Sequence, residues 1–267
     1  MPTNPDKSAD RPEGDRIAKL LARAGVASRR EIERMIADKR ITLNGKTVET
    51  PATFLTDLKG VSVDGKAVGP VEATMLVAFH KPTGLITAER DGAGRATIYD
   101  ALRNALPKGT PRLMPIGRLD LNTEGLLLLT NDGGLKREME LPSTGIPRIY
   151  RARAYGEVTQ DQLEGLIEGI EIDGVRYGSI DANLERGGGS SSGPSKAKNH
   201  WIEMTITEGK NREVRRVLEF FELKVSRLIR TSYGPFALGD LPRGRAEIIR
   251  KGDLSRFQSQ LKRGYGN

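Results

Sequence analysis

The apolar residues of this chain occur in short runs separated by polar turns, and this pattern restricts the folds that the chain can adopt. The longest runs are Met75–Phe79 and Leu126–Leu129. Both are far shorter than the ~20 residues that a membrane-spanning helix needs, but they have the length of buried β-strands. The first 15 residues are polar and rich in proline, with no apolar signal segment. We therefore expect no membrane insertion and no Sec-type export, and a cytoplasmic protein.

The first part of the chain has the pattern of a small domain that follows a disordered arm. Residues 1–13 lack apolar periodicity and contain three prolines, which predicts disorder. Apolar residues then recur at helical spacing from Ile17 to Ala24, and a second short helix is predicted after the capping residue Ser28. We expect these helices and two hairpins to form one domain over residues 14–70. The predicted hairpin turns are Asn44-Gly45 and Asp64-Gly65.

The rest of the chain alternates strand and helix patterns, which predicts a second, larger domain over residues 74–252 and an α+β fold class for the whole chain. A Gly/Ser-rich insertion at residues 187–199 is expected to be flexible, and residues 253–267 are expected to form a basic C-terminal tail. The predicted strands are 75–79, 126–130, 148–156, 201–207 and 225–230, and the predicted helices are 98–106, 159–166 and 211–221.

The charge and the scarcity of cysteine and histidine exclude several classes of function. Lys and Arg number 43 against 35 Asp and Glu, which gives a net charge of +8 at pH 7. A basic balance of this size points to a polyanionic partner, of which nucleic acid is the commonest, although a solvated basic surface is the alternative. Cysteine is absent, and the only histidines are His80 and His200. This excludes disulfides, thiol catalysis and Cys/His metal clusters within the chain, and we expect no metal site.

Positive charge is concentrated in residues 14–40, which hold eight Lys and Arg against four acids. Helical periodicity places most of these cations on the face opposite the apolar residues, where they suit the binding of phosphates. This stretch resembles the S4 RNA-binding domain, whose paired helices present a basic face to structured RNA. The resemblance assigns RNA contacts to Arg16, Lys19, Arg29, Arg30, Arg34, Lys39 and Arg40.

Three short motifs match known functional motifs in their letters but not in their context. Residues 60–66 spell most of a phosphate-binding loop, but Ala67 replaces the hydroxyl residue that would bind magnesium, and a hairpin is predicted there. A G-x-S-x-G match lies within the Gly/Ser-rich insertion instead of at a strand-to-helix turn. Asp120 and Glu124 could pair as carboxylates, but a predicted turn separates them. We also interpret both histidines as strand-end residues.

A polar turn within residues 115–133 has a different character. It carries Arg118, Asp120 and Thr123, and it is followed by an apolar run and an Asn-Asp-Gly turn. Functional residues often stand on loops that a scaffold of this kind holds in place. From the residues alone, however, the simpler interpretation is that Asp120 hydrogen-bonds within its own turn.

The segment GRLDLNTEGLLLLTNDG resembles the signature of one group of pseudouridine synthases, whose A type modifies small-subunit ribosomal RNA and whose B, E and F types modify large-subunit ribosomal RNA. Residues 81–87 (KPTGLIT) resemble an earlier motif of the group, and residues 208–244 resemble its B type. With the S4-like unit, the similarity covers residues 14–250. It implies a catalytic domain with a mixed, mainly antiparallel sheet. It also implies an isomerase that converts a specific uridine of large-subunit (23S) ribosomal RNA to pseudouridine without a cofactor.

The resemblance also assigns roles to single residues. Asp120 aligns with the catalytic aspartate, which acts as a nucleophile or as a base. A carboxylate in a closed pocket stays charged only beside a cation, and Arg215, at the family's basic position, is expected to pair with Asp120. Tyr150 aligns with the tyrosine that stacks on the extruded uracil, and Leu228 is the candidate for an apolar pocket residue. The other predicted substrate contacts are Arg118, Lys81, Lys210, Arg212 and Arg216.

Two other functions remain open on the sequence. A non-catalytic ribosome-assembly protein or RNA chaperone built on an S4 domain would explain the basic charge and the first domain, but not the larger domain that follows. The same chemistry at a small-subunit (16S) ribosomal RNA site is the closer alternative. For the protein itself we expect ribosomal RNA as the partner and no membrane. We also expect a monomer, because the sequence has no long heptad pattern or large apolar stripe.

Overall fold

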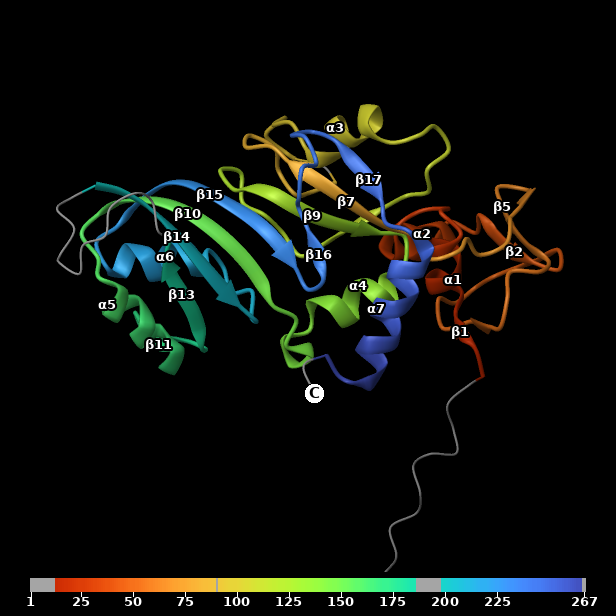
Figure 1. Cartoon of the computed structure of the whole chain (residues 1–267). Coiled ribbons are helices and arrows are strands. Elements are labelled where there is room, and N and C mark those ends of the chain that lie inside the picture. Colours follow the sequence, from red (N-terminus) through yellow and green to blue (C-terminus); the bar gives the residue numbers. More distant parts are fainter. Residues whose placement is uncertain (1–12, 90, 186–197, 266–267) are drawn as a thin grey trace, which may run out of the picture. The chain divides into compact units, whose positions relative to one another are not determined.

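The computed structural model describes residues 13–89, 91–185 and 198–265 and divides the chain into two compact units, Met1–Thr74 and Met75–Asn267 (Figure 1). Nearly all of the predicted disordered arm falls on residues 1–12 and most of the predicted insertion on residues 186–197, and these stretches lie outside the described residues. Each unit has its own apolar core. Among the described residues, the chain has no helix that combines the length and the apolar character needed to span a membrane.

The first unit is built from two amphipathic helices and small sheets, as predicted. Helix α1 (Ile17–Arg23) and helix α2 (Arg29–Ala37) contact each other through their apolar faces. The Ser28 hydroxyl caps α2 by accepting a hydrogen bond from the Glu31 amide at 3.3 Å. Strands β3-β2-β5-β6 form one antiparallel sheet, and β1 pairs with β4. The strands are β1 (Asp15–Arg16), β2 (Ile41–Leu43), β3 (Lys46–Thr47), β4 (Phe54–Leu55), β5 (Val61–Val63) and β6 (Lys66–Ala67).

The two hairpin turns set the register of the outer strand pairs of the four-stranded sheet, β2 with β3 and β5 with β6. Asn44 and Asp64 adopt left-handed backbone angles, at φ 50° and 49°, and the glycines that follow them do the same at 78° and 75°. This is the type I′ geometry, whose twist fits a two-residue hairpin. In the central pair, β2 with β5, Ile41 and Val61 belong to the core shared with the helices, where both are at most 1% exposed.

The second unit is organised around a long, curved sheet (Figure 1). Its described strands run in the order β13-β14-β10-β15-β9-β7-β17, with β8 paired to β9 and β16 paired to β15. Every described pair is antiparallel except β15 with β9, so the sheet is mixed and mainly antiparallel, as predicted. The strands are β7 (Leu76–Lys81), β8 (Met114–Ile116), β9 (Glu124–Thr130), β10 (Arg148–Gly156), β13 (Ile180–Leu184), β14 (Lys198–Ile206), β15 (Lys224–Tyr233), β16 (Phe236–Ala237) and β17 (Ala246–Ile248).

Apolar cores lie on both faces of β7 and β9. Val77 and Leu127 belong to one core cluster and Leu76 and Leu126 to another, because successive side chains of a strand point to opposite faces. Burial on both faces explains why these strands are continuous apolar runs. Helices α3, α5 and α6 contribute to the first cluster, and α4 and α7 to the second. The remaining elements are α3 (Ile98–Ala105), α4 (Gly133–Glu140), α5 (Gln160–Glu164), α6 (Glu213–Phe220), α7 (Lys251–Arg263), β11 (Ile170–Ile172), β12 (Val175–Tyr177) and two 3-10 helices, Pro142–Thr144 and Gly165–Glu168.

The C-terminal stretch differs from the prediction of a basic tail. Leu254 and Phe257 of helix α7 are 5% and 1% exposed, within the core cluster that also holds Phe236. The rings of Phe257 and Phe236 meet edge-to-face, with their centroids 5.0 Å apart. The prediction is wrong because it is based on the three basic residues of this stretch and overlooks the apolar residues Leu254, Phe257 and Leu261, which stand at helical spacing.

The parallel contact between β9 and β15 depends on Gly125. The register pairs Gly125 with Arg230 and Glu124 with Ile229. Gly125 has φ 108°, and a Cβ added to it would lie 2.3 Å from the carbonyl oxygen of Arg230. A side chain would therefore meet main-chain atoms that have no room to move, in a backbone conformation that suits glycine. Gly125 thus fixes the position of the turn before β9 relative to β15.

We expect Gly125→Ala to lower the free energy of unfolding by more than about 2 kcal/mol, because the variant combines backbone strain with a clash. Urea unfolding measures this loss. Gly165→Ala is the matched control, since Gly165 has φ −59° and nothing lies within 4 Å of an added Cβ. Equal stability of the two variants would contradict the role given to the close approach at Gly125.

Candidate active site

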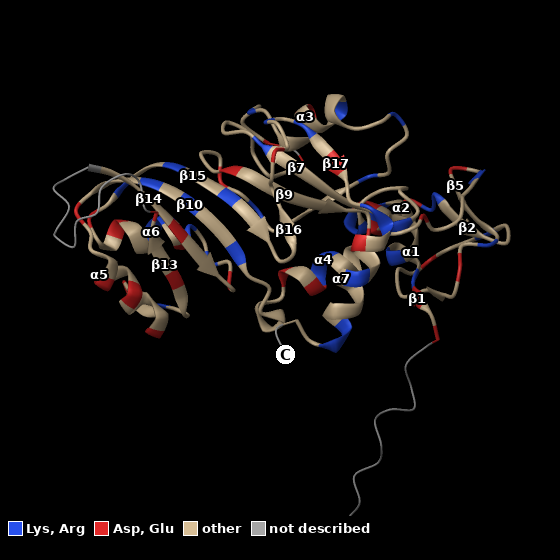
Figure 2. Cartoon of the chain, in the orientation of Figure 1, with Lys and Arg blue, Asp and Glu red and all other residues tan. Residues whose placement is uncertain are grey.

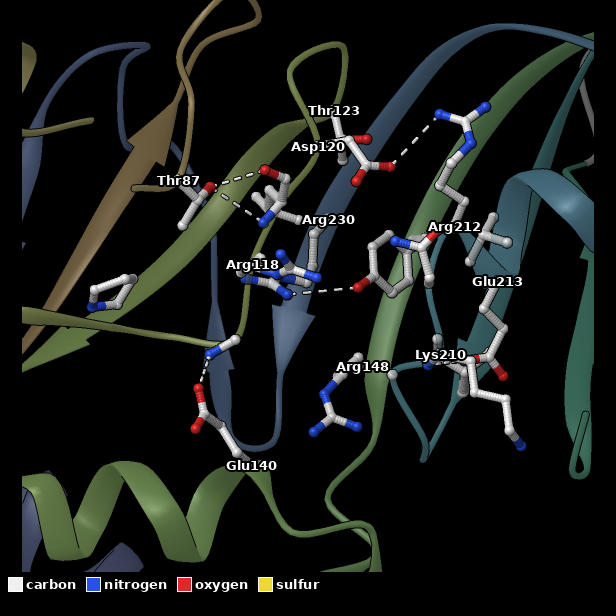
Figure 3. A pocket seen from close by; sticks show the side chains of 18 of the residues that line it. Thr87, Arg118, Asp120, Thr123, Glu140, Arg148, Lys210, Arg212, Glu213 and Arg230 are labelled. Carbon is white, nitrogen blue, oxygen red and sulfur yellow. Dashed lines mark hydrogen bonds and ion pairs between the residues drawn. The ribbon is translucent and has the colours of Figure 1, made fainter. Parts of the chain in front are cut away.

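A cleft of about 710 Å³ opens on the second unit (Figure 3). Its walls come from the turn before β9, from β10 and β15, and from the segment that leads into α6. The fold thus brings together three motifs that are far apart in the sequence. The predicted residues Lys81 and Arg216 are not part of the lining. Those that line the cleft are Arg118, Asp120, Tyr150, Lys210, Arg212, Arg215 and Leu228.

Asp120 stands on a turn that is held through its main chain. Its carbonyl accepts a hydrogen bond from the Thr123 amide at 3.1 Å. The Thr87 hydroxyl donates to the Leu119 carbonyl at 2.8 Å and accepts from the Leu119 amide at 3.2 Å. Within the described residues the Asp120 carboxylate makes no hydrogen bond to its own turn, and the side chain is 38% exposed. The carboxylate is therefore available to the cleft, in contrast to the simpler interpretation of the sequence.

Lys81 anchors the same turn from inside the unit. Its ammonium group is fully buried and donates hydrogen bonds to the carbonyls of Thr123 at 2.8 Å, Asp120 at 3.0 Å and Pro82 at 3.1 Å. Burial lowers the pKa of Lys81 to about 8, although the charges of Asp120 and Glu124 oppose this shift. The prediction of a direct substrate contact is corrected, because Lys81 uses its donors on the turn and lies outside the cleft lining.

The cation paired with Asp120 is Arg212 and not Arg215. Arg212 Nη1 lies 3.8 Å from Asp120 Oδ2, in an ion pair whose two side chains are partly exposed (Figure 3). Arg215 is 7% exposed and donates to the carbonyls of Asn122 at 3.0 Å and Val225 at 3.3 Å. Burial lowers the pKa of Arg215, and the nearby Arg212 charge adds to the shift. The predicted ion pair is thus corrected: Arg215 fastens α6 to the turn, and Arg212 supplies the neighbouring charge.

Strands β10 and β15 contribute another wall of the cleft. Tyr150 and Leu228 line it and are 9% and 4% exposed. The register places Arg230 opposite Tyr150, and Arg230 Nη1 donates to the Tyr150 hydroxyl at 3.4 Å. Arg230 is only 2% exposed and was not predicted. The sequence feature that could have indicated Arg230 is its position two residues after Leu228, because residues two apart in a strand have their side chains on the same face.

Glu213, at the start of α6, is a buried carboxyl group that also lines the cleft and was not predicted. Its Oε2 accepts a hydrogen bond from the Lys210 amide at 2.9 Å, and the residue is 3% exposed. Burial raises the pKa of Glu213 to about 7, and the charge of Glu208 adds to the rise. Lys210 itself pairs with Glu208 and lies 5.7 Å from the centre of the Tyr177 ring. The positive charge of Lys210 is therefore partly neutralised within the protein.

Of the two remaining residues predicted to contact the substrate, Arg118 lines the cleft and Arg216 does not. Arg118 is exposed and contributes to the cleft lining. Arg216 lies on the exposed side of α6, while Arg215 and Val217 on either side of it are buried. A contact between Arg216 and a phosphate would therefore form outside the cleft.

The basic residues predicted to bind RNA in the first unit lie on and beside α1 and α2, where several are visible in blue (Figure 2). Ion pairs this accessible to solvent are weak, so a phosphate can replace the acid. Three residues form such pairs: Lys19 with Asp15, Arg34 with Glu31, and Arg40 with Asp64. The others, Arg16, Arg29, Arg30 and Lys39, are exposed.

Comparisons with known proteins agree with this division of the chain. A family model described as RNA pseudouridylate synthase matches residues 75–220, and an S4 domain model matches residues 15–57. The chain is 42% identical over 237 residues to an uncharacterised RNA pseudouridine synthase of Rickettsia bellii, covering 88% of this chain and 97% of that protein.

Further relatives carry more specific names. The chain is 38% identical over 240 residues to the ribosomal large subunit pseudouridine synthase B of Pasteurella multocida, covering 87% of this chain and 66% of that protein. Among solved structures, a pseudouridylate synthase matches 90% of this chain and 98% of its own, with a TM-score of 0.60 at 22% identity. This structural match shows the same fold.

We expect Lys81→Met to loosen the turn, because methionine provides no donor for the three carbonyl groups that Lys81 bonds. Amide hydrogen exchange in residues 119–124 should accelerate by at least about tenfold, the effect of losing one hydrogen bond to a charged group. The exposed substitution Lys251→Met is the control. Wild-type exchange rates for the turn in Lys81→Met would show that Lys81 does not hold it.

Glu213 should make stability depend on pH. Its pKa is raised from 4.5 to about 7, so its contribution to stability is fully present below about pH 4.5 and is lost as the pH rises through 7. Glu213→Gln resembles the protonated form and removes this dependence. In urea unfolding between pH 4.5 and 8, the free energy of the wild type minus that of the variant should fall with rising pH. A difference that stays constant would contradict the raised pKa.

Proposed function

Because the chain belongs to the RNA pseudouridylate synthase family, we propose that its cleft isomerises a specific uridine of large-subunit (23S) ribosomal RNA, with Asp120 as the catalytic carboxylate. Family membership makes the protein an isomerase of RNA. The similarity to a ribosomal large subunit pseudouridine synthase supports large-subunit RNA as the substrate. The observation that carries the role of Asp120 is that its carboxylate lines the cleft, partly exposed, on a turn that does not use it.

The chemistry of the reaction requires one free carboxylate. The bond between N1 of uracil and C1′ of ribose breaks, the base turns, and C5 forms a new bond to C1′. One proton leaves C5 and one is taken up at N1, so nothing is oxidised, reduced or hydrolysed. An ionised carboxylate serves as the nucleophile or as the base that this exchange needs.

The other carboxyl groups that line the cleft are held by closer partners than Asp120 has. Glu213 accepts a main-chain hydrogen bond and has a raised pKa. The remaining carboxylates form ion pairs with one basic side chain each: Glu89 with Arg112, Glu140 with Lys136, and Glu208 with Lys210. Among the described residues, the Asp120 carboxylate forms a single ion pair, the 3.8 Å contact with Arg212, and this longer contact leaves it open to a nucleoside.

The target base must leave the RNA stack to reach Asp120. Tyr150 and Leu228 supply an aromatic and an apolar surface against which an extruded uracil can pack. Stacking on an aromatic ring is worth about 1–3 kcal/mol per base, which offsets part of the lost stacking within the RNA.

The first unit serves, in this proposal, as the docking surface for folded RNA. Its accessible Lys and Arg residues suit contacts with phosphates, which position a protein on RNA without selecting a sequence. Binding through such contacts weakens as the salt concentration rises. We further propose that the protein acts in the cytoplasm, where ribosomal RNA matures, and that it acts as a monomer.

Asp120→Asn should reduce pseudouridine formation by about 10²–10⁴-fold or more, because the amide can act neither as a nucleophile nor as a base. Pseudouridine mapping of total ribosomal RNA, from cells that carry only the wild type or the variant, measures the loss. Asp240→Asn is the matched control, since Asp240 is exposed and lies outside the cleft.

The same mapping separates the alternatives. A pseudouridine in 23S RNA that disappears with Asp120→Asn supports the proposal. An Asp120-dependent pseudouridine in 16S RNA would instead assign the activity to the RNA of the small ribosomal subunit. If no mark depends on Asp120, the non-catalytic role in ribosome assembly replaces the proposal.

A further inference from the structure

Three arginines in the cleft wall are buried without an acidic partner. Arg148, Arg215 and Arg230 are 6%, 7% and 2% exposed and all line the cleft. Their hydrogen bonds go to main-chain carbonyls and to tyrosine hydroxyls. Within the described ranges none of the three forms an ion pair with a carboxylate. A buried charge is costly unless it is paired, so this wall of the cleft is complementary to an anion.

In the described part of the chain, two of these arginines have a buried donor without a partner, Arg215 at Nε and Arg230 at Nη2, and only in Arg230 does this donor stand at the end of the guanidinium. The Nε of Arg230 donates to the Leu126 carbonyl at 2.7 Å, whereas the hydrogen bond from Nη1 to the Tyr150 hydroxyl is long, at 3.4 Å. Nη2 is buried, and no group among the residues that the structure describes accepts a hydrogen bond from it. The guanidinium lies 6.0 Å from the centre of the Tyr150 ring, which lines the cleft, and 5.3 Å from the centre of the Tyr233 ring, which is not part of the lining. A buried donor without a partner costs free energy that a bound acceptor would restore.

The position of Arg230 is fixed by the main chain. A register shift between Ile149 and Tyr150 sets Arg230 opposite Tyr150, and the close approach of Gly125 holds Arg230 from the other side. Arg148 packs its guanidinium 4.8 Å from the Tyr233 ring, which adds a second positive charge to this region. In the view of Figure 3, Arg148 and Arg230 lie toward one side of the cleft and the Asp120–Arg212 ion pair toward the other.

We infer that Arg230 binds a phosphate of the RNA backbone next to the target uridine, an inference that rests on the proposed function of the cleft. A guanidinium matches a phosphate in shape and charge. A carbonyl of uracil would satisfy a single donor but would not balance the charge of the buried arginines. An extruded nucleotide carries its own phosphate into the cleft. Because Arg230 also contacts the Tyr150 hydroxyl, it would hold the phosphate at a fixed place relative to the ring that stacks on the base.

Three small ligands test this inference without any reaction. Uridine, uridine 5′-monophosphate and uridine 3′-monophosphate are titrated into the full chain, and NMR measures each dissociation constant. At least one monophosphate should bind the wild type roughly tenfold to hundredfold more tightly than uridine, the effect of a hydrogen bond to a charged group. In Arg230→Met this ratio should fall to about one, the value expected when the contact is lost.

Two further variants separate phosphate binding from a structural role. Arg230→Lys keeps the charge but not the planar fork, so part of the preference for the monophosphate should remain. Arg103→Met removes an arginine of α3 that is 76% exposed, and it should keep the full preference. A substitution that only loosens the cleft would weaken the binding of all three ligands equally, so the ratio of the dissociation constants of uridine and the monophosphate would stay unchanged. If Arg230→Met does not fold, the loss of part of the ratio in Arg230→Lys decides the question.

The inference fails if the wild type shows no preference for a monophosphate, or if the preference survives in a folded Arg230→Met variant. Its failure is distinct from that of the proposed function. If RNA is modified in an Asp120-dependent manner but the ratio does not depend on Arg230, only the phosphate site is lost. If the ratio depends on Arg230 but no RNA is modified, the cleft remains a nucleotide phosphate site and the isomerase assignment falls.

Discussion

The close approach of β9 and β15 at Gly125 and Arg230 is the constraint on which the second unit depends. It is the one place in the described sheet where two strands run parallel, and it joins the β7–β9 part of the sheet to the β10–β14 part. Without this contact, the turn that carries Asp120 would not meet Tyr150. Because Gly125 has no side chain, β9 can approach β15 closely, and this contact allows three motifs that are far apart in the sequence to line one cleft.

The turn around Asp120 combines a fixed backbone with a free carboxylate. Lys81 and Arg215 are buried, and both donate hydrogen bonds to main-chain carbonyl groups of the turn. The Thr87 hydroxyl donates a hydrogen bond to the carbonyl of Leu119, next to Asp120. Because these bonds go to main-chain atoms, the Asp120 side chain is left to the cleft and to Arg212. Burial lowers the pKa of both anchoring cations, which is the cost of placing them under the turn.

The fold could be predicted well from the sequence because its signals are local. Runs such as Leu126–Leu129, hairpin turns and capping residues each specify an element from its own neighbours. The sequence could not show that Arg212, and not Arg215, forms the ion pair with Asp120. The two arginines are three residues apart at the start of a helix, so either could lie near a turn that is distant in the sequence. The predicted substrate contact of Lys81 is wrong because a sequence motif indicates that a residue has a role but does not show which atoms its side chain contacts.

The other differences have similar causes. Arg230 lies in an alternating strand, where its spacing to Leu228 shows the face but not that the side chain is buried beside the rings of Tyr150 and Tyr233. In α7, the net positive charge of the stretch does not reveal the buried pair Leu254 and Phe257, because composition is averaged over a stretch whereas burial concerns one side of a helix.

The sheet order has a consequence for the synthesis of the protein. Strand β7 opens the second unit, yet its outer neighbour β17 is translated much later, and α7 completes the core cluster that Leu76 begins. Contacts between such distant segments cannot form until the intervening chain has been translated. The first unit, whose contacts are local, can fold while translation continues. A nascent chain can therefore complete its first unit, which matches the S4 domain model, well before the core of the second unit is closed.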